Sequence, residues 1–366
     1  MKFSTTQKQF VSAIQLVEKM IGKKESLPVL SCIVIQAQKN QLTIQATNLE
    51  SGIVVSIPAH IDQEGVVAVE ATLLSQFIRS IKEDALCGEL QDGNFVITSK
   101  QSTNILKSIS VSEFPFITEH SLTEKNTTPK DILIEGIRSV VYAASPSMIR
   151  PELGSVFFSF VDMVCTSVAT DSFRLAEKTL RSHTSVTADL LIPLKYTLEL
   201  LHILEHCPGS TVSWNIVDDS YVVFQNESFY YTTRIVDSKF PNYREIIPKD
   251  AHVEITLLKN DLAEVLKKAR IFSDTEQYIG FHLYPERKVC TVTASSSRVG
   301  EMSDSLDVVM KGQDLDIKFH ISYIADCLSS IQSDSVTLSF AGVGRPVVIT
   351  GVSDQTFRYL VMPLNR

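Results

Sequence analysis

The feature that most constrains the fold of this chain is an internal repeat with a period near 120 residues. Three strand-like segments each end in an alanine that is followed by small polar residues, and these alanines, Ala46, Ala169 and Ala294, lie 123 and 125 positions apart. The alternation of apolar and polar residues before each alanine is typical of a half-buried β-strand. A chain with such a period is expected to fold as a series of related units.

Two further landmarks follow the same period. Helical patterns begin at Val69-Glu70-Ala71, Ile192-Pro193-Leu194 and Phe319-His320-Ile321, which lie 123 and 127 positions apart, and Phe114-Pro115 precedes Phe240-Pro241 by 126 positions. Apolar residues then recur at the i, i+3/i+4, i+7 spacing of an amphipathic helix. The helical faces are Leu74, Phe77, Ile78 and Ile81; Leu194, Leu198, Leu201 and Leu204; and Ile321, Ile324, Leu328 and Ile331.

Each unit is predicted to contain two helices and about eight short strands. The first helix of each unit is expected at Phe10–Ile21, Ile137–Ala144 and Leu262–Ala269, and Asp92-Gly93 predicts a tight hairpin turn. Polar stretches around residues 119–130 and 248–250 indicate linkers. The resulting prediction is an α+β protein with domains at residues 1–122, 129–248 and 249–366.

The composition excludes several other classes of protein. The 366 residues are 44% hydrophobic and 21% charged, as in a globular protein. No apolar run approaches the ~18 residues of a membrane span, and the N-terminus does not resemble a secretory signal, so we expect no membrane association and a cytoplasmic location. The six cysteines are scattered, which predicts buried, reduced thiols and no zinc site.

A search for catalytic chemistry finds no concentrated set of reactive groups. His202 and His206 stand at i, i+4 on a predicted helix, but no third ligand accompanies them. Asp171-Ser172 has no base beside it in the sequence. We therefore predict no catalytic residue, no metal and no cofactor. An enzyme that acts on nucleic acid through Asp171 or the histidine pair stays open as an alternative, and so does a structural scaffold that does not bind DNA.

Basic residues recur on or near the predicted helices. If the helices of all units lined one surface, these charges would form a stripe that contacts phosphates without reading base sequence. The net charge of −8 argues against a generally basic surface but not against a local one. The candidate DNA-binding residues are Lys23, Lys24, Arg79, Lys82, Arg150, Lys195, Lys267 and Lys268.

Several motifs along the whole chain resemble the bacterial DNA polymerase III sliding clamp, the β subunit of the replicative polymerase. They are Arg150-Pro151-Glu152-Leu153, Ala169 to Ala176, Phe240-Pro241-Asn242-Tyr243-Arg244 and Tyr359 to Leu364. The resemblance implies a non-catalytic processivity factor with the DNA clamp fold, in which three repeated domains each pack two helices on antiparallel sheets. It further implies a head-to-tail homodimer, a six-domain ring that encircles double-stranded DNA.

The resemblance also implies one pocket per chain that receives a short peptide motif of the replicative polymerase, the clamp loader and repair proteins. Carried over by motif, its residues are Leu153, Thr170, Ser172, Phe173, Arg174, Leu175, Pro241, Ile246, His320, Tyr323, Pro346, Val361, Met362, Pro363 and Leu364. The chain departs from the usual family pattern at Ser172-Phe173. For the dimer interface, the resemblance points to Leu106 against Ile271 and Phe272 of the second copy.

Overall fold

The computed structural model describes residues 1–22, 27–100, 102–119, 126–182, 184–275 and 277–364. By its internal contacts the chain forms two compact units. Unit 1 comprises Met1–Ile134 and Lys195–Ile235, and unit 2 comprises Glu135–Leu194 and Val236–Arg366. No helix among the described residues is long and apolar enough to cross a membrane.

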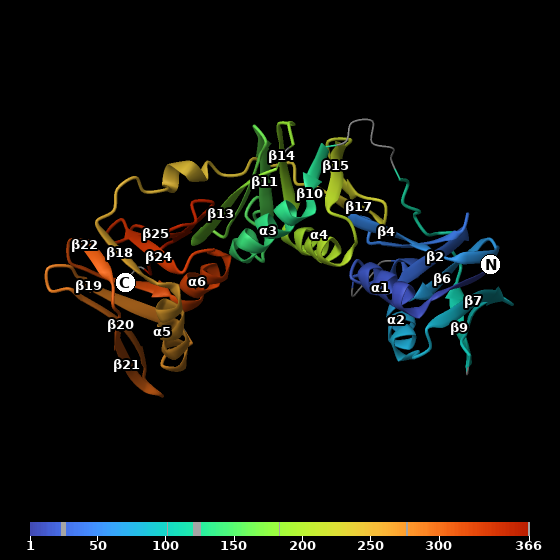
Figure 1. The fold of residues 1–366 in the computed structure, drawn as a ribbon, viewed down its shortest axis with the longest axis horizontal. Helices are drawn as coiled ribbons and strands as arrows, with labels where there is room; N and C mark the ends of the chain where they lie inside the picture. The colour runs from blue at the N-terminus through green and yellow to red at the C-terminus, as the bar shows by residue number, and fades with distance from the viewer. Residues whose placement is uncertain (23–26, 101, 120–125, 183, 276, 365–366) are drawn as a thin grey trace. The chain divides into compact units, whose positions relative to one another are not determined.

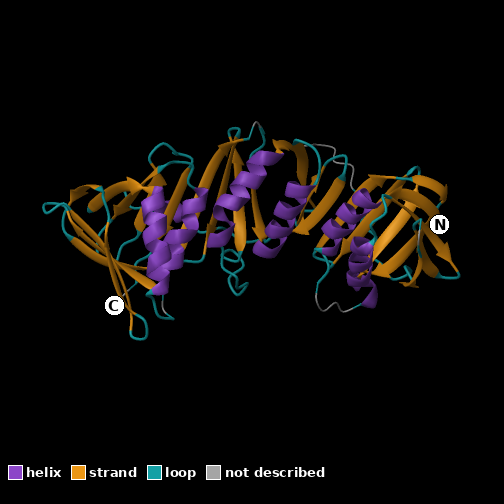
Figure 2. Ribbon diagram, turned by 60° about the horizontal axis from the view of Figure 1, so that its bottom comes forward, coloured by secondary structure: helices purple, strands orange, loops and turns teal. Residues whose placement is uncertain are grey.

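Unit 1 is built on one sheet of thirteen strands with helices on one face (Figures 1 and 2). The helices are α1 (Gln7–Glu18), α2 (Ala71–Ser80) and α4, which is Leu194–His206 and joins this unit from Lys195 onward. Along the sheet the strands are β10 (Asn126–Pro129), β15 (Thr211–Val217), β16 (Tyr221–Gln225), β17 (Phe229–Arg234), β4 (Ser51–Pro58), β3 (Gln41–Thr47), β2 (Cys32–Gln38), β6 (Gly65–Glu70), β9 (Thr103–Ile109), β8 (Asn94–Thr98), β7 (Ala85–Gln91), β1 (Lys2–Thr6) and β5 (His60–Gln63).

Unit 2 contains two antiparallel sheets. The nine-stranded sheet runs β14 (Ala188–Pro193), β11 (Ser155–Val161), β12 (Val164–Thr170), β13 (Arg174–Arg181), β26 (Phe357–Val361), β25 (Val347–Gly351), β24 (Ser335–Phe340), β18 (Val253–Leu258) and β22 (Val309–Gly312). The four-stranded sheet runs β21 (Gly300–Ser305), β20 (Val289–Ser296), β19 (Tyr278–Tyr284) and β23 (Leu315–His320). The helices are α5 (Lys259–Ile271) and α6 (Ile321–Asp326), together with α3 (Lys130–Val140), whose first five residues belong to unit 1.

The repeat predicted from the sequence is present in the strands and helices. Ala46, Ala169 and Ala294 lie in the equivalent strands β3, β12 and β20, and the three helices predicted after them are α2, α4 and α6. The turn at Asp92-Gly93 is also confirmed, since both residues have positive φ and Gln91 pairs with Asn94.

Two helices differ from their predicted extents. Helix α3 begins at Lys130 and ends at Val140, whereas the apolar pattern suggested Ile137–Ala144. Helix α6 is only six residues long, and the chain continues as a 3₁₀ turn from Cys327 to Ser330. Leu328 and Ile331 are buried all the same, because a 3₁₀ turn keeps nearly the same side facing the sheet.

Strands from successive repeats are joined edge to edge in the same way twice. In unit 1, β4 of the first repeat pairs with β17 of the second, with Ser51 opposite Thr233. In unit 2, β13 of the second repeat pairs with β26 of the third, with Arg174 opposite Val361. We call these the first and the second strand join. Because backbone hydrogen bonds form both joins, sequence identity between the repeats is not needed to reproduce them.

Candidate functional site

The residues predicted for the partner pocket surround the turn between β12 and β13, next to the second strand join. The hydroxyl of Thr170 donates to the carbonyl of Arg174 at 2.7 Å and accepts from the amide of Ser172 at 3.1 Å. The carboxylate of Asp171 accepts from the amides of Phe173 and Arg174, both at 2.9 Å. These bonds hold Ser172 at a φ of 79° and leave Phe173 60% exposed.

Arg174 organises one side of this site. Its guanidinium contacts the carboxylates of Asp171 at 3.0 Å and Asp326 at 2.6 Å and lies 4.5 Å from the ring centre of Tyr323. The ring of His320 lies 4.8 Å from that of Tyr323. Burial, together with the Arg174 charge, lowers the pKa of His320, so the imidazole is neutral at pH 7. The result is a surface of two mutually tilted rings and one guanidinium.

The other side of the site is apolar. Leu175 lies opposite Leu360 across the second strand join, and both pack with Val168 and Tyr243. Phe240 covers this cluster, and its ring stacks on Phe157 with 4.9 Å between centres. Leu360 was missed by the sequence prediction, which named its neighbour Val361. The β-strand alternation was the available signal, since residues 359 and 361 point away from the face that carries residue 360.

The chain end closes the site. The amide of Met362 donates to the carbonyl of Phe173 at 2.8 Å, and the amide of Leu364 donates to that of Lys318 at 2.9 Å. The side chains of Met362 and Leu364 are 39% and 43% exposed, so they are available to a ligand, whereas Pro363 is buried.

The remaining predicted pocket residues lie around this centre to different degrees. Pro241 follows Phe240 and is half-buried, and Ile246 is exposed in the next 3₁₀ turn. Pro346 directly precedes Val347, which pairs with Val361. Leu153 is buried in a separate turn before β11, where its amide donates to the carbonyl of Arg150.

Family models account for nearly the whole chain. The N-terminal, central and C-terminal domain models of the DNA polymerase III beta subunit match residues 1–118, 127–242 and 244–365 in that order. The chain belongs to the DNA polymerase III beta subunit family. Family membership confirms the predictions of a sliding clamp, of three repeated clamp domains and of a non-catalytic accessory role.

Individual relatives agree with the family models. The beta sliding clamp of Vibrio cholerae is 25% identical over 372 residues and covers all of both chains. That of Streptococcus pneumoniae is 26% identical and covers 99% of each. The crystal structure of the DNA polymerase III beta subunit of Thermotoga maritima superposes with a TM-score of 0.93 at 23% identity, over 100% of this chain and 99% of that chain, which supports the fold.

The clamp's predicted DNA-binding residues are all exposed where the structure describes them, but most already have an acidic partner. Arg79 pairs with Glu18 at 3.0 Å, Arg150 with Glu152 at 3.0 Å and Lys268 with Asp304 at 2.9 Å. Lys195 lies 3.9 Å from Glu199. Lys82 and Lys267 form no ion pair with any described residue, while Lys23 and Lys24 lie outside the described residues.

The structure gives no support to the two groups of residues that were considered as an enzyme site. The carboxylate of Asp171 is engaged by two amides and by Arg174, so it stabilises a turn. The rings of His202 and His206 are 4.2 Å apart, but the described residues contain no group of three metal-ligating side chains. All six cysteines are free thiols, and five are buried; Cys87 is half-buried, which corrects the prediction for that residue.

The residues predicted for the dimer interface are placed differently in the two units. Leu106 lies in β9 of unit 1 and is only 7% exposed, while its neighbour Ile105 is 67% exposed. In unit 2, Ile271 ends α5 and is 64% exposed, and Phe272 is half-buried. Helix α5 contacts the edge strand β21 through the pair Lys268–Asp304.

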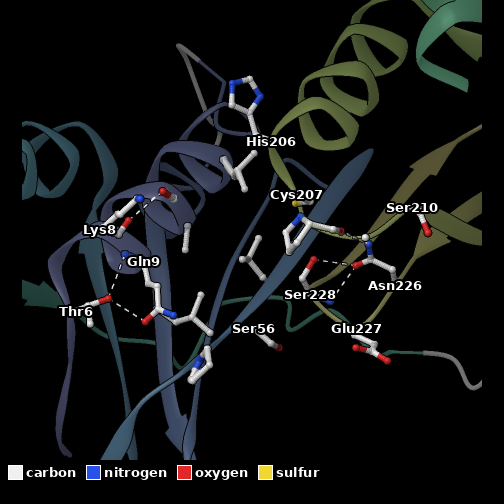
Figure 3. Close-up of a pocket in the computed structure, with 18 of the residues that line it drawn as sticks. Thr6, Lys8, Gln9, Ser56, His206, Cys207, Ser210, Asn226, Glu227 and Ser228 are labelled. Carbon is white, nitrogen blue, oxygen red and sulfur yellow. Dashed lines mark hydrogen bonds between the residues drawn. The ribbon is translucent and has the colours of Figure 1, made fainter. Parts of the chain in front are cut away.

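A separate hollow of about 990 Å³ lies in unit 1 between the start of α1 and the end of α4 (Figure 3). Thr6 caps α1 on one side, and the turn of Asn226 to Ser228 forms the opposite side. The side-chain amide of Asn226 donates to the carbonyl of Pro208 at 2.8 Å. None of the residues predicted for DNA, partner or dimer contacts lines this hollow, so it is not part of the site described above.

The first strand join carries a buried acid where the second carries an ion pair. Glu199 accepts from the hydroxyls of Ser51 at 2.9 Å and Tyr231 at 3.2 Å through one carboxylate oxygen, and its other oxygen is buried without a hydrogen bond. Burial raises the pKa of Glu199 to about 7, although the two hydroxyls and Lys195 oppose the shift.

Glu199 therefore makes the clamp less stable as the pH rises. Because its pKa is raised in the folded state, the folded chain binds the proton more tightly, and the free energy of unfolding falls between about pH 4.5 and pH 7. The variant Glu199→Gln keeps the two hydrogen bonds without the charge. We expect it to be more stable than the wild type at pH 8 by on the order of 2 kcal/mol and nearly equal at pH 5.

The measurement is urea unfolding of both proteins between pH 5 and pH 8. Glu227→Gln, in an exposed turn, is the matched control and should change stability little at any pH. A constant difference between wild type and Glu199→Gln over this range would show that the carboxyl does not titrate there.

Proposed function

We propose that two copies of this sliding clamp close head to tail into a ring around duplex DNA and hold the replicative polymerase on its template. The observation that carries the proposal is the strand join that occurs twice along the chain. Since β4 meets β17 and β13 meets β26 with corresponding registers, a third join of the same kind would connect the third repeat of one copy to the first repeat of the other.

Within the part of the chain that the structure describes, the strands for this third join have free edges. Strand β21 is the last strand of its sheet, and on β9 only residues 108 and 109 pair with β6. If β21 of the second copy pairs with β9 in the register of the two existing joins, Gly300 of the second copy lies opposite Leu106. Ile105 would then lie on the outer face of the seam, where the two existing joins carry Thr232 and Leu360. Two such seams, related by a twofold axis, close a ring of six domains.

The basic residues on the helices fit a surface that contacts DNA weakly. Lys82 and Lys267 are unpaired among the described residues, and the arginines and lysines with acidic partners are half-exposed or more, so phosphates can compete for them. Such contacts are independent of sequence and weaken with salt, which allows sliding. With a ring, retention on DNA does not depend on affinity, and this is consistent with the net charge of −8.

The site beside the second strand join is the proposed dock for short peptide motifs of the polymerase, the clamp loader and repair proteins. Its apolar side, with Leu175, Leu360 and Met362, suits aliphatic and aromatic anchors, while Arg174 and Tyr323 form the opposite side. Methionine adapts its shape to different anchors. A cytoplasmic location, beside the chromosome, is part of the same proposal.

A variant with two charges in this dock tests the peptide assignment. We expect Met362→Asp combined with Leu364→Asp to weaken binding of the cognate polymerase's clamp-binding peptide by at least about 100-fold, because apolar anchors would face buried charges. Both backbone amides that close the site are kept. Fluorescence polarisation with the labelled peptide gives the affinity, and sedimentation should show an unchanged dimer. Val343→Asp, at an 82% exposed position in the same repeat, is the control; equal affinities of all three proteins would contradict the assignment.

A further inference from the structure

The turn beside the first strand join contains the same set of hydrogen bonds as the turn of the partner dock. The hydroxyl of Thr47 donates to the carbonyl of Ser51 at 2.8 Å and accepts from the amide of Leu49 at 3.1 Å, as Thr170 does in the second turn. The side chain of Asn48 accepts from the amides of Glu50 and Ser51, as Asp171 accepts from those of Phe173 and Arg174. Leu49 has a φ of 73°, close to the 79° of Ser172.

The strand that pairs with this turn also forms the equivalent backbone hydrogen bond at each join. The amide of Arg234 donates to the carbonyl of Glu50 at 2.9 Å, as that of Met362 donates to Phe173 at 2.8 Å. Arg234 thus stands in the position of Met362, and its side chain lies 3.6 Å from the carboxylate of Glu50. The backbone of a peptide dock is therefore present twice in the chain, with different side chains.

The outer face of the first join carries a hollow of about 290 Å³, and Ile117, one of its lining residues, packs directly over Gly52. The second join has Leu175 opposite Leu360, whereas the first has Gly52 opposite Thr232. Tyr221 takes the place of Pro346, because Val222, which follows Tyr221, pairs with Thr233, just as Val347, which follows Pro346, pairs with Val361. The hollow is lined by Ile117, Thr118, Val217, Asp218, Tyr221, Val223, Tyr230 and Thr232.

The lining combines an apolar floor with an acidic rim. Ile117 and Val217 pack on the cluster of Val54, Val223 and Tyr230. At the rim, Asp218 is exposed in a turn at a φ of 52° and forms no ion pair with a described residue. Asp218 is the acidic residue that lines the hollow. The corresponding connection at the second join carries Val343 and Arg345 and no acid.

We propose that this hollow is a second docking groove of the clamp, which receives a lysine or arginine side chain from an extended segment of a partner protein. The aliphatic stem of such a side chain fits against the apolar floor, while its charge reaches Asp218 at the rim. Charge complementarity decides the occupant, because an acidic side chain would be repelled by the carboxylate of Asp218 and an uncharged one would leave it unpaired.

The groove is accessible in the proposed ring. Tyr231, the neighbour of Tyr230 and Thr232 on β17, points to the helical side and contacts Tyr196 and Glu199 of α4. Successive side chains of a strand point to opposite faces, so the hollow opens away from the helices that are proposed to face DNA. This inference extends the docking role, but the groove belongs to unit 1 alone and its occupancy does not require the dimer or the dock at the second join.

The test uses three fluorescein-labelled peptides of the sequence Thr-Val-X-Val-Thr, in which X is lysine, norleucine or glutamate. Fluorescence polarisation with the full-length protein should give the tightest binding for lysine, about 5-fold or more above norleucine, and the weakest for glutamate. Asp218→Asn keeps a residue that tolerates positive φ and should remove the preference for lysine. Thr232→Leu introduces the leucine of the second join and should abolish binding of all three peptides.

Matched variants distinguish this groove from the other acidic turns and from the dock at the second join. Asp92→Asn removes an acid from another hairpin turn of unit 1, where φ is 47°, and should leave binding unchanged. The double variant Met362→Asp with Leu364→Asp should also bind the lysine peptide normally. Equal binding of the three peptides to the wild type, or retention of the lysine peptide by a folded Thr232→Leu protein, would overturn the proposal. Loss of polymerase-peptide binding in Asp218→Asn or Thr232→Leu, or its retention in the double variant, would instead count against the dock at the second join.

Discussion

Replacement of Ile271 with aspartate is expected to convert the clamp from a dimer into monomers at micromolar concentration. Ile271 is 64% exposed at the end of α5, next to the free edge of β21, so the charge costs little in the separated chain. In the proposed ring it would be buried at both seams. An unpaired charge in an interface weakens association by at least about 100-fold, and a ring with two seams suffers this cost twice.

Sedimentation velocity of the 40.7 kDa chain distinguishes the two states. Leu258→Asp is a suitable control, because Leu258 is 53% exposed at the opposite end of the same helix. Ile105→Pro is a second, independent variant. It removes an amide that the strand register directs toward the seam and keeps the bonds between β9 and β8. A wild-type protein that is already monomeric, or an Ile271→Asp protein that remains a dimer, would contradict the proposed seam.

The sequence was sufficient to predict the architecture, because the landmarks of the repeat are backbone features. Ala46, Ala169 and Ala294 mark the same strand in each repeat, and the periodic leucines and isoleucines mark the helices. These signals survive divergence, since a strand needs only alternation and a helix only its apolar face. The short α6 was overestimated because periodicity does not distinguish an α-helix from a following 3₁₀ turn.

The partner dock was predicted through the family resemblance rather than from local signals. The motif from Thr170 to Leu175 was recognised. The prediction named the neighbour of Leu360 and not Leu360 itself, since only the strand register shows which residue faces Leu175. Glu199 could not be identified from the sequence, because its environment is formed by Ser51 and Tyr231, which are distant along the chain. The hollow at the first join is lined by Ile117, Asp218 and Thr232 among others, which are distant along the chain, so it is likewise a tertiary feature.

We propose that the clamp is held on DNA by its shape and not by its affinity. The clamp should therefore be loaded on a nicked circular plasmid by its clamp loader, separated from free protein by gel filtration, and followed before and after the circle is cut once. The salt concentration should be high enough to weaken phosphate contacts, which lose about 10³-fold or more in affinity between low and moderate salt when several phosphates are involved.

Retention on the circle and release from the linear DNA are the expected results, and blocking both ends with bound protein should restore retention. Ile271→Asp should not be retained on either DNA. The direct measurement is the fraction of clamp that co-elutes with the plasmid before and after linearisation. A large fall on cutting is predicted, whereas an equal fraction on circular and linear DNA with open ends would contradict topological binding.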